Sequence, residues 1–274
     1  MATPTLRAIR RRFPTAHIAW LGGPAALATL AGLPWADELL GDPSKGRGLR
    51  GLLRGARLLR DGRFDLAVLL SNTFRAALLC RMGRIRSRVG YDRDGRGFLL
   101  TDRLEVPRDE HGRFAVIAAL EYYLGMARHL GCDTTDHTMH LAVDPADGAA
   151  ADAMLDEAGV GDDELIVLIN PGASFGASKL WMPDRFAAVA DALVETHGAR
   201  IIINAAPSER PIAAAVADAM RHRPAINFAH RDNTLGLLKA LTARAGLMIT
   251  GDTGPRHIAA ALGCAVVTLF GPTN

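Results

Sequence analysis

The sequence is poor in cysteine and contains no long hydrophobic run, and both shortages narrow the classes of protein that it fits. Only three of its 274 residues are cysteines, and none forms a Cys-x-x-Cys pair with another. This spacing favours reduced core residues in a cytosolic protein over a disulfide framework. No apolar run reaches the ~18 residues of a membrane span, and the arginine-rich N-terminal stretch has no signal-peptide core behind it. We therefore expect a cytoplasmic protein.

Aromatic residues are also scarce, at 5% of the chain, and no basic strand pattern is interleaved with them. Nucleic-acid binding, which relies on aromatic stacking and basic patches, is therefore not expected. Hydrophobic residues at 49% and charged residues at 22% are ordinary values for a folded globular chain. The length is sufficient for two domains.

Positive charge is concentrated in the first half. Residues 1–144 carry 22 Lys and Arg against 15 Asp and Glu, a net charge of +7, whereas residues 145–274 carry a net charge of −4. A basic half suggests an acidic partner, such as a phosphorylated glycan or an anionic lipid surface. Arginines spread over solvated faces are the alternative, and they would explain the same counts.

Short β-rich runs alternate with longer helical patterns along the chain, which predicts parallel α/β architecture. Two doubly wound domains that meet near residue 145 are the simplest arrangement. The predicted strands are 17–21, 65–71, 87–91, 165–170, 200–205, 225–228, 246–250 and 265–270. The predicted helices are 6–12, 49–59, 74–82, 113–130, 183–196, 209–221, 235–243 and 255–262.

The most informative segment lies between the predicted strand 246–250 and the predicted helix 255–262. It reads Gly251-Asp252-Thr253-Gly254-Pro255, with His257 in the first helical turn. Glycines allow close approach of a ligand, and the free amide groups at a helix start attract an anion, so the segment predicts a phosphate site. The alternative is that Asp252 or Thr253 only caps the helix and that His257 is a partly buried polar residue.

A second glycine-rich loop, residues 171–179, follows the predicted strand 165–170 and contains Lys179. Only three lysines occur in the chain, and a compact ammonium suits a diphosphate leaving group. Because loops after parallel strands gather at one sheet edge, this loop, residues 204–209 and residues 251–257 converge on one ligand in our prediction. Glu209 would accept hydrogen bonds from ribose hydroxyls, or would serve only as a favourable charge in the first turn of its helix.

Two further patterns are weaker. Gly46-Arg47-Gly48-Leu49-Arg50-Gly51 matches the dinucleotide pattern G-x-G-x-x-G, but Gly41-Asp42-Pro43-Ser44-Lys45 precedes it instead of a strand. Asp92-Arg93-Asp94 matches an Asp-x-Asp metal clamp but lies in a Gly/Arg/Asp-rich stretch that predicts a surface turn. Neither pattern is expected to bind a cofactor or a metal ion.

Taken jointly, the loops resemble a known family. The shared segments are Phe64-Asp65-Leu66, Arg88-Val89-Gly90-Tyr91, Pro171-Gly172-Ala173-Ser174, Lys179-Leu180-Trp181, Asp252-Thr253-Gly254-Pro255-Arg256-His257 and Leu269-Phe270-Gly271-Pro272-Thr273. In this order they are similar to the ADP-heptose:lipopolysaccharide heptosyltransferases, which are GT-B glycosyltransferases. The stretch 171–181 is closer to the type II enzymes than to type I.

The resemblance implies a GT-B-like α/β fold with two Rossmann-like domains that face each other across a cleft. Residues 1–144 would form the acceptor-side domain and residues 145–274 the nucleotide-sugar domain. The implied reaction is metal-independent, inverting transfer of heptose from ADP-heptose to the lipopolysaccharide inner core, with no cofactor. The acceptor would lie at the inner membrane surface, which the protein would contact peripherally.

The resemblance also assigns roles to single residues. Ser174 and Lys179 would contact the phosphates, and Lys179 would stabilise the leaving group. Glu209 would bind the ribose and Asn233 would lie near the base. The diphosphate and the sugar would be bound by Asp252, Thr253, Gly254 and His257.

The chain departs from the family pattern at both ends. We expect the first domain to lack its first strand, and with it the aspartate that acts as general base, and the second domain to lack its closing helices. A non-catalytic nucleotide-sugar-binding fragment, or a paralogue that uses another nucleotide sugar, is therefore the alternative. Whether this 274-residue chain turns over substrate is left open at this point.

Overall fold

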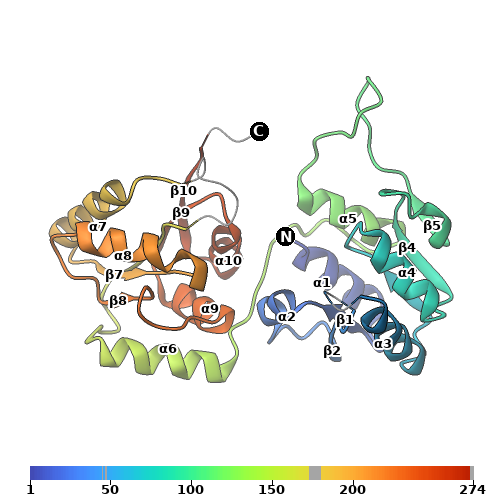
Figure 1. Cartoon of the computed structure of the whole chain (residues 1–274), viewed down its shortest axis with the longest axis horizontal. Coiled ribbons are helices and arrows are strands. Elements are labelled where there is room, and N and C mark those ends of the chain that lie inside the picture. The colour runs from blue at the N-terminus through green and yellow to red at the C-terminus, as the bar shows by residue number, and fades with distance from the viewer. Residues whose placement is uncertain (45, 47, 173–179, 272–274) are drawn as a thin grey trace. The chain divides into compact units, whose positions relative to one another are not determined.

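The structure, a computed structural model, describes residues 1–44, 46, 48–172 and 180–271. The chain divides into two compact units (Figure 1). Unit 1 comprises residues 1–27 and 34–139, and unit 2 comprises residues 28–33 and 140–274. Each unit is described by itself below.

Unit 1 contains two small parallel sheets flanked by helices. The strand order is β1-β2 in one sheet and β3-β4-β5 in the other. The elements are α1 (Thr3–Arg12), β1 (Ala19–Gly22), the start of α2 (Pro24–Leu30), β2 (Glu38–Gly41), α3 (Gly48–Asp61), β3 (Leu66–Val68), α4 (Phe74–Met82), β4 (Ser87–Tyr91), the 3-10 turn η1 (Gly97–Leu99), β5 (Asp102–Leu104) and α5 (Ala119–His129).

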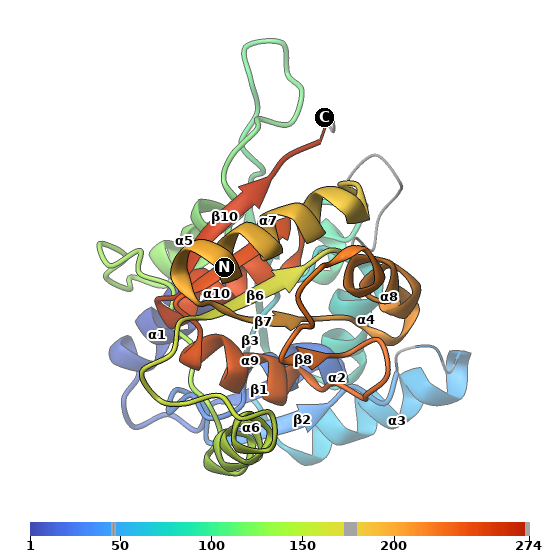
Figure 2. The same cartoon turned by 90° about the vertical axis from the view of Figure 1, so that its left-hand side faces the viewer.

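Unit 2 contains one five-stranded parallel sheet in the order β10-β9-β6-β7-β8, and β6, β7 and β8 can be followed side by side in Figure 2. The elements are α6 (Pro145–Glu157), β6 (Ile166–Asn170), α7 (Pro183–His197), β7 (Arg200–Ile203), the 3-10 turn η3 (Pro207–Glu209), α8 (Arg210–Ala219), β8 (Ile226–Asn227), α9 (Leu235–Arg244), β9 (Leu247–Gly251), α10 (Gly254–Leu262) and β10 (Ala265–Leu269).

The strand order explains which helices share a face of the sheet in unit 2. The chain moves in one direction from β6 to β8, then returns past β6 to β9 and continues the other way to β10. Since parallel crossovers are right-handed, this reversal places α7 and α8 on one face and α9 and α10 on the other. The packing agrees, because α7 contacts α8 and α9 contacts both α6 and α10.

The central strands of this sheet are apolar on both sides. Val167, Leu168 and Ile169 of β6 and Ile202 and Ile203 of β7 are fully buried. Such two-sided burial is what continuous Val/Ile/Leu runs predict for strands covered by helices on each face. Burial of each of these side chains stabilises the fold by about 1.5–3 kcal/mol. The five strands predicted for residues 145–274 are thereby confirmed, with ends within two residues of the prediction.

The prediction of one long helix over 113–130 is wrong. Helix α5 begins at Ala119, and the preceding residues form a loop in which Arg108 and Phe114 make an isolated antiparallel bridge. The carboxylate of Asp109 accepts hydrogen bonds from the amide groups of His111 and Arg113, both at 2.9 Å. This local turn competes with helix formation, as aspartate side chains commonly do.

Other differences concern elements with a weak pattern. Elements α2, β2, β5 and α6 were not predicted, and the helix predicted over 209–221 spans Arg210–Ala219. Helix α6 is alanine-rich and has little apolar periodicity, so its start is set by local chemistry instead. Pro145 occupies its first turn, and the Asp144 side chain caps it by accepting from the Ala146 amide at 2.9 Å.

Residues 28–33 are held in unit 2 by a buried lysine of α9. The Lys239 side chain is fully buried, and its Nζ donates to the carbonyl oxygens of Ala31 at 3.0 Å and Thr29 at 3.3 Å. Burial lowers the pKa of Lys239, while the nearby Asp147 and Asp144 act in the opposite direction. Lys239 therefore serves the fold and is not a ligand-facing group.

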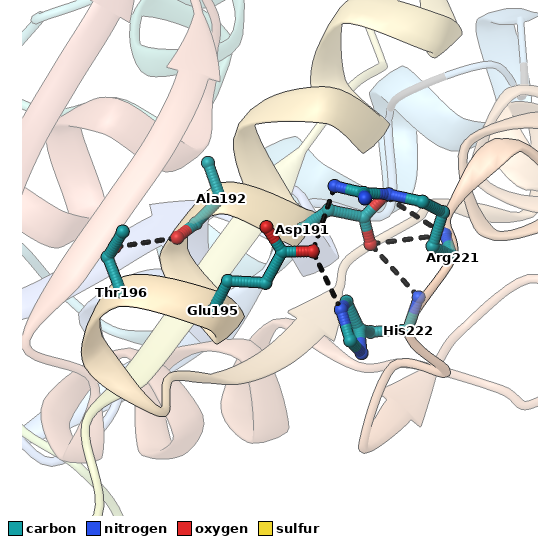
Figure 3. Close-up of polar contacts among 6 residues, drawn as sticks. All are labelled: Asp191, Ala192, Glu195, Thr196, Arg221 and His222. Atoms are coloured by element: carbon teal, nitrogen blue, oxygen red, sulfur yellow. Dashed lines mark hydrogen bonds and ion pairs between the residues drawn. The ribbon is translucent and has the colours of Figure 1, made fainter.

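A buried aspartate joins α7 to the segment after α8 (Figure 3). The Asp191 carboxylate accepts the backbone N–H groups of Arg221 and His222 at distances of 2.9–3.1 Å. Burial raises the pKa of Asp191, but these amide hydrogen bonds outweigh it, and the pKa lies below its ordinary value of 3.8. The ionised carboxylate is thus the form that stabilises the fold.

Asp191→Asn is expected to lower the free energy of unfolding at pH 7 by about 1–3 kcal/mol, because hydrogen bonds to an ionised carboxylate are stronger than those to a neutral carboxamide. The folded-state pKa is lowered, so the contribution of the carboxylate is complete above about pH 4 and is lost as the pH falls through the folded-state value. Urea unfolding at several pH values measures this. Asp218→Asn, at an exposed position of α8, is the control; equal losses in both variants would contradict the role of Asp191.

Candidate functional site

The candidate site of unit 2 lies where the strand order reverses. Strands β6 and β9 are neighbours, with Asn170 opposite Thr250, and the chain leaves them toward opposite edges of the sheet. In open α/β sheets, ligands bind outside the carboxyl ends of the strands at such a switch point. The loops after β6 and β9, which contain residues 171–179 and 252–253, both start there. The topology therefore selects the two loops that the sequence analysis singled out.

A chain of hydrogen-bonded asparagines crosses this carboxyl edge. The Asn233 Nδ2 donates to Asn204 Oδ1 at 2.5 Å, and the Asn204 Nδ2 donates to Asn170 Oδ1 at 2.5 Å. The Asn170 Nδ2 then donates to the hydroxyl oxygens of Thr250 at 3.1 Å and Thr253 at 3.3 Å. Since Asn170 and Asn204 are 2% and 4% exposed, these bonds are shielded from water and couple the orientations of the three amides.

The end of this chain leaves one acceptor without a donor. The Asn233 Oδ1 is buried and has no hydrogen-bond partner among the residues that the structure describes. Its amide cannot simply turn over, because its Nδ2 is needed as the donor to Asn204. A buried acceptor of this kind is costly unless a ligand supplies an N–H or O–H group. The Asn233 Oδ1 is therefore the atom to which a donor group of a ligand would hydrogen-bond.

The start of α10 is the second component. Thr253 is the N-cap residue, yet its side chain makes no capping bond and contacts Asn170 and Thr250 instead. The first amide groups of a helix have no partner within the helix. Those of Gly254 and Arg256 are therefore available to an anion, and the helix dipole favours negative charge there. A capping role for Thr253, the alternative from the sequence, is not what the side chain performs.

Gly254 gives a ligand access to these amides. A Cβ atom added at Gly254 would meet nothing within 4 Å, and the residue has no positive φ angle. Neither packing nor backbone conformation requires glycine at this exposed position. Open space next to a helix start is the arrangement that lets a diphosphate come close.

The side chains around this helix start carry charge and a titratable ring. Arg256 pairs with Asp252 at 3.0 Å and lies over the Phe270 ring at 5.4 Å. Burial lowers the pKa of His257, and the positive charge of Arg256 lowers it further, while Asp252 acts in the opposite direction. The imidazole is thus neutral at pH 7 and offers both a hydrogen-bond donor and an acceptor.

Glu209 belongs to the same edge. It ends the turn η3, directly before α8, and its Oε2 accepts from the Ala206 amide at 3.1 Å. Its carboxyl group lies so close to Gly172 that a Cβ atom at residue 172 would collide with it. The carboxylate therefore stands beside Gly172, and its Oε1 makes no hydrogen bond to another of the described residues.

The structure thus places six of the predicted residues on one edge: Glu209, Asn233, Asp252, Thr253, Gly254 and His257. Ser174 and Lys179 lie outside the described residues. Asn170 was missed by the sequence analysis, and Asn204 was noted only as the start of a loop. The sequence does contain a pattern that identifies both residues, because each asparagine comes directly at the end of an apolar strand run.

The profile of glycosyltransferase family 9 (heptosyltransferase) matches residues 52–274, which is most of the chain. The chain belongs to this family. The lipopolysaccharide core heptosyltransferase OpsX of Haemophilus influenzae is 24% identical to it over all of this chain and 75% of the relative. Lipopolysaccharide heptosyltransferase 3 of Escherichia coli K12 is 28% identical over all of this chain and 79% of the relative.

The fold of this heptosyltransferase-family chain is also found in solved structures. The glycosyl transferase family 9 protein of Veillonella parvula superposes with a TM-score of 0.88 at 25% identity, over all of this chain and 77% of the other. The expected family, the glycosyltransferase class and the GT-B type of α/β fold are thereby confirmed. The type II subclass stays a prediction, because heptosyltransferases 2 and 3 are similarly related to the chain.

A hollow of about 1060 Å³ lies at the opposite, amino-terminal ends of the strands in unit 2 and is bordered by Arg200 and Arg231. The Arg200 Nη2 donates to the carbonyl oxygens of Ala158 and Gly159, just after α6, at 2.9 and 3.0 Å. Arg231 pairs with Glu157 at 3.0 Å. Arginines at helix C-termini neutralise the negative end of the helix dipole. Both arginines therefore have structural partners, and the candidate site is the one at the carboxyl edge.

Proposed function

We propose that this member of glycosyltransferase family 9 transfers heptose from ADP-heptose to a hydroxyl of the lipopolysaccharide core, with inversion and without a metal ion. The observation that carries the proposal is the β6/β9 switch point, where the asparagine chain meets the uncapped start of α10. One end accepts from a base and the other attracts a diphosphate. A nucleotide diphosphate sugar has both groups.

The reaction needs little covalent chemistry from unit 2. The acceptor oxygen forms a bond to the anomeric carbon, the bond from that carbon to the phosphate oxygen breaks, and ADP leaves with the electron pair. A base takes the hydroxyl proton. The negative charge that grows on the departing diphosphate is stabilised by the amides of Gly254 and Arg256 and by the ammonium of Lys179. These groups supply the positive potential that other glycosyltransferases obtain from a metal ion.

The remaining residues position the donor. Asn233 Oδ1, the unpartnered acceptor, would take a hydrogen bond from the amino group of adenine. Glu209 would bind ribose hydroxyls, and Ser174 would contact the phosphates. Asp252, Thr253 and His257, at the start of α10, would bind the diphosphate and the heptose hydroxyls. No cofactor is needed in this scheme, because the donor substrate already carries the activated bond.

The acceptor is assigned to the first half of the chain, whose net charge is +7 over residues 1–144. A phosphorylated, carboxylate-bearing core glycan on an anionic membrane surface is complementary to that charge. In the described part of the chain, no helix is both long and apolar enough to cross a bilayer. We therefore propose a cytoplasmic protein with peripheral membrane contact.

The test is a transfer assay with ADP-heptose and heptose-free lipopolysaccharide core glycan, in which ADP release and the mass of the glycan are both measured. Release of ADP in step with addition of one heptose is the expected result. ADP binding without transfer would favour a non-catalytic nucleotide-sugar-binding protein, and transfer from a different nucleotide sugar would favour a paralogue with another donor. Either result would overturn the proposed reaction.

Gly254→Ala is expected to weaken ADP binding about 10-fold, or about 1.4 kcal/mol, while thermal stability is unchanged or slightly raised. The added methyl group would occupy the open space beside the amides of the first turn. Calorimetric titration with ADP measures the effect. Gly41→Ala in β2 is the matched control, since a Cβ there also meets nothing within 4 Å. Unchanged ADP affinity in Gly254→Ala would remove the α10 start from the donor site.

A further inference from the structure

Unit 1 contains a small pocket that has the features of a binding site. It is separate from the candidate site described for unit 2. It has a volume of about 240 Å³ and is lined by Asn72, Arg93, Phe114, Tyr122 and Tyr123, among others. Asn72 follows β3 and Arg93 follows β4, so the pocket opens at the carboxyl end of the β3-β4-β5 sheet. The two tyrosines come from α5, and Phe114 from the loop before it.

The amide of Asn72 is locked in one orientation. Arg96 is fully buried, and its Nη2 donates to Asn72 Oδ1 at 3.1 Å, while its Nε donates to the Tyr91 carbonyl at 3.1 Å. The Tyr122 hydroxyl also donates to Asn72 Oδ1, at 3.1 Å. Because guanidinium groups have no acceptor, the atom facing Arg96 is the amide oxygen. The Asn72 Nδ2, with two N–H groups, has no hydrogen-bond partner within the described residues.

The aromatic wall beside Asn72 is equally fixed. Tyr122 stacks on Tyr91 with ring centres 4.0 Å apart. The backbone of Gly125 leaves room for Tyr91, since a Cβ atom there would overlap the tyrosine hydroxyl. A rigid aromatic face next to directed N–H donors is a common way to bind a sugar ring, whose C–H groups pack on the ring while its oxygens accept hydrogen bonds.

Arg93 supplies the positive charge of the pocket. Its guanidinium lies over the Phe114 ring at 4.6 Å, and its Nε is 3.7 Å from Asp94, a long ion pair. The terminal nitrogens are left for a ligand, and a guanidinium binds a carboxylate or phosphate through two parallel hydrogen bonds. The polar groups that converge here are therefore mainly donors, and one of them is charged.

The size and chemistry together define the ligand class. At ~30 Å³ per water molecule, 240 Å³ is equivalent to about eight waters, which is the space of one sugar ring with its substituents. We propose that this pocket is the subsite for one acidic sugar unit of the acceptor. In it, the Asn72 amide donates to sugar oxygens, Tyr122 packs against the ring, and Arg93 pairs with the acid group. Arg96 acts as a positioning residue for Asn72. The inference rests on the proposed function for the identity of the acceptor.

The test uses the full chain and two probes: delipidated, heptose-free core glycan and the same glycan with its carboxyl groups reduced to alcohols. Ligand-observed NMR titration measures affinity, and ADP binding is titrated in parallel. Asn72→Asp keeps the oxygen that Arg96 and Tyr122 need but removes both N–H donors, so glycan binding is expected to weaken 10-fold or more. Arg93→Gln is expected to abolish the preference for the carboxylated glycan.

Arg103→Gln on β5 is the matched control, because Arg103 does not line the pocket, and it should bind both glycans as the parent chain does. Circular dichroism spectra and thermal unfolding like those of the parent chain show that each of the three variants is folded. Glycan affinities that are equal in Asn72→Asp, Arg93→Gln and the parent chain would overturn the subsite, as would the absence of glycan binding to the parent chain. If the parent chain transfers no heptose but binds the glycan, and this binding weakens in Asn72→Asp, the proposed reaction would be overturned and the subsite would not.

Discussion

Asn204→Leu is expected to lower both the stability of unit 2 and its affinity for ADP more than any other single substitution on this edge. Leucine has nearly the shape of asparagine but removes the acceptor for Asn233 Nδ2 and the donor to Asn170 Oδ1. Two buried polar groups would then be unsatisfied, at a cost of about 1–3 kcal/mol each. Asn233 would turn to find another partner, so its Oδ1 would no longer face the adenine amine.

The expected decrease in ADP affinity is about 100-fold. A site that recognises the base through a hydrogen bond loses most of its affinity and selectivity when its own hydrogen-bonding group, here the Asn233 amide, is misplaced. Titration with ADP and with inosine diphosphate, which has a carbonyl in place of the amine, separates base reading from general damage. The parent chain should prefer ADP strongly and the variant should not. Thr242→Val, at a fully buried position outside the asparagine chain, is the control. Lower stability with an unchanged ADP preference would make the asparagine chain purely structural.

The residues of this chain show what the sequence can and cannot predict. The apolar runs that end in Asn170 and Asn204 predict buried strands with polar ends, and the structure contains both strands. The contact of Asn170 with Thr250 joins residues 80 positions apart and requires β6 and β9 to be neighbours. Lateral strand order depends on the packing of whole crossovers, which local periodicity does not encode. The sequence therefore predicts the two strands and their polar ends, but not which strand ends are neighbours.

Unit 1 was harder to predict for a different reason. Strands β2 and β5 have four and three residues, too few for a period-2 pattern to stand out. The Asn72 pocket depends on Arg96, a residue in a polar, glycine-containing segment that predicts a solvated turn. Its guanidinium is instead fully buried and hydrogen-bonded to Tyr91 and Asn72. A buried arginine whose bonds are mostly to backbone and amide oxygens leaves little trace in composition or periodicity.

Lys179→Ala is expected to lower the turnover number of heptose transfer by about 100-fold or more, equivalent to at least ~2.7 kcal/mol of transition-state stabilisation. The reason is chemical: the C–O bond breaks toward a diphosphate whose negative charge grows as ADP departs, and an ammonium beside it interacts more strongly with the transition state than with the bound donor. Such a group changes the turnover number more than KM. The chain contains only two other lysines, Lys45 and Lys239, and Lys239 is fully buried.

Steady-state kinetics with ADP-heptose and core glycan measure the effect, and Lys179→Arg separates charge from geometry. Arginine keeps the positive charge but replaces a compact ammonium by a planar fork, so a partial recovery of turnover is expected. Arg185→Ala, which removes an exposed cation from the start of α7, is the control for a general loss of positive potential. A change in KM alone would assign Lys179 to donor binding, and turnover equal to that of the parent chain would exclude it from leaving-group stabilisation. In that case the amides at the start of α10 would have to carry the diphosphate charge by themselves.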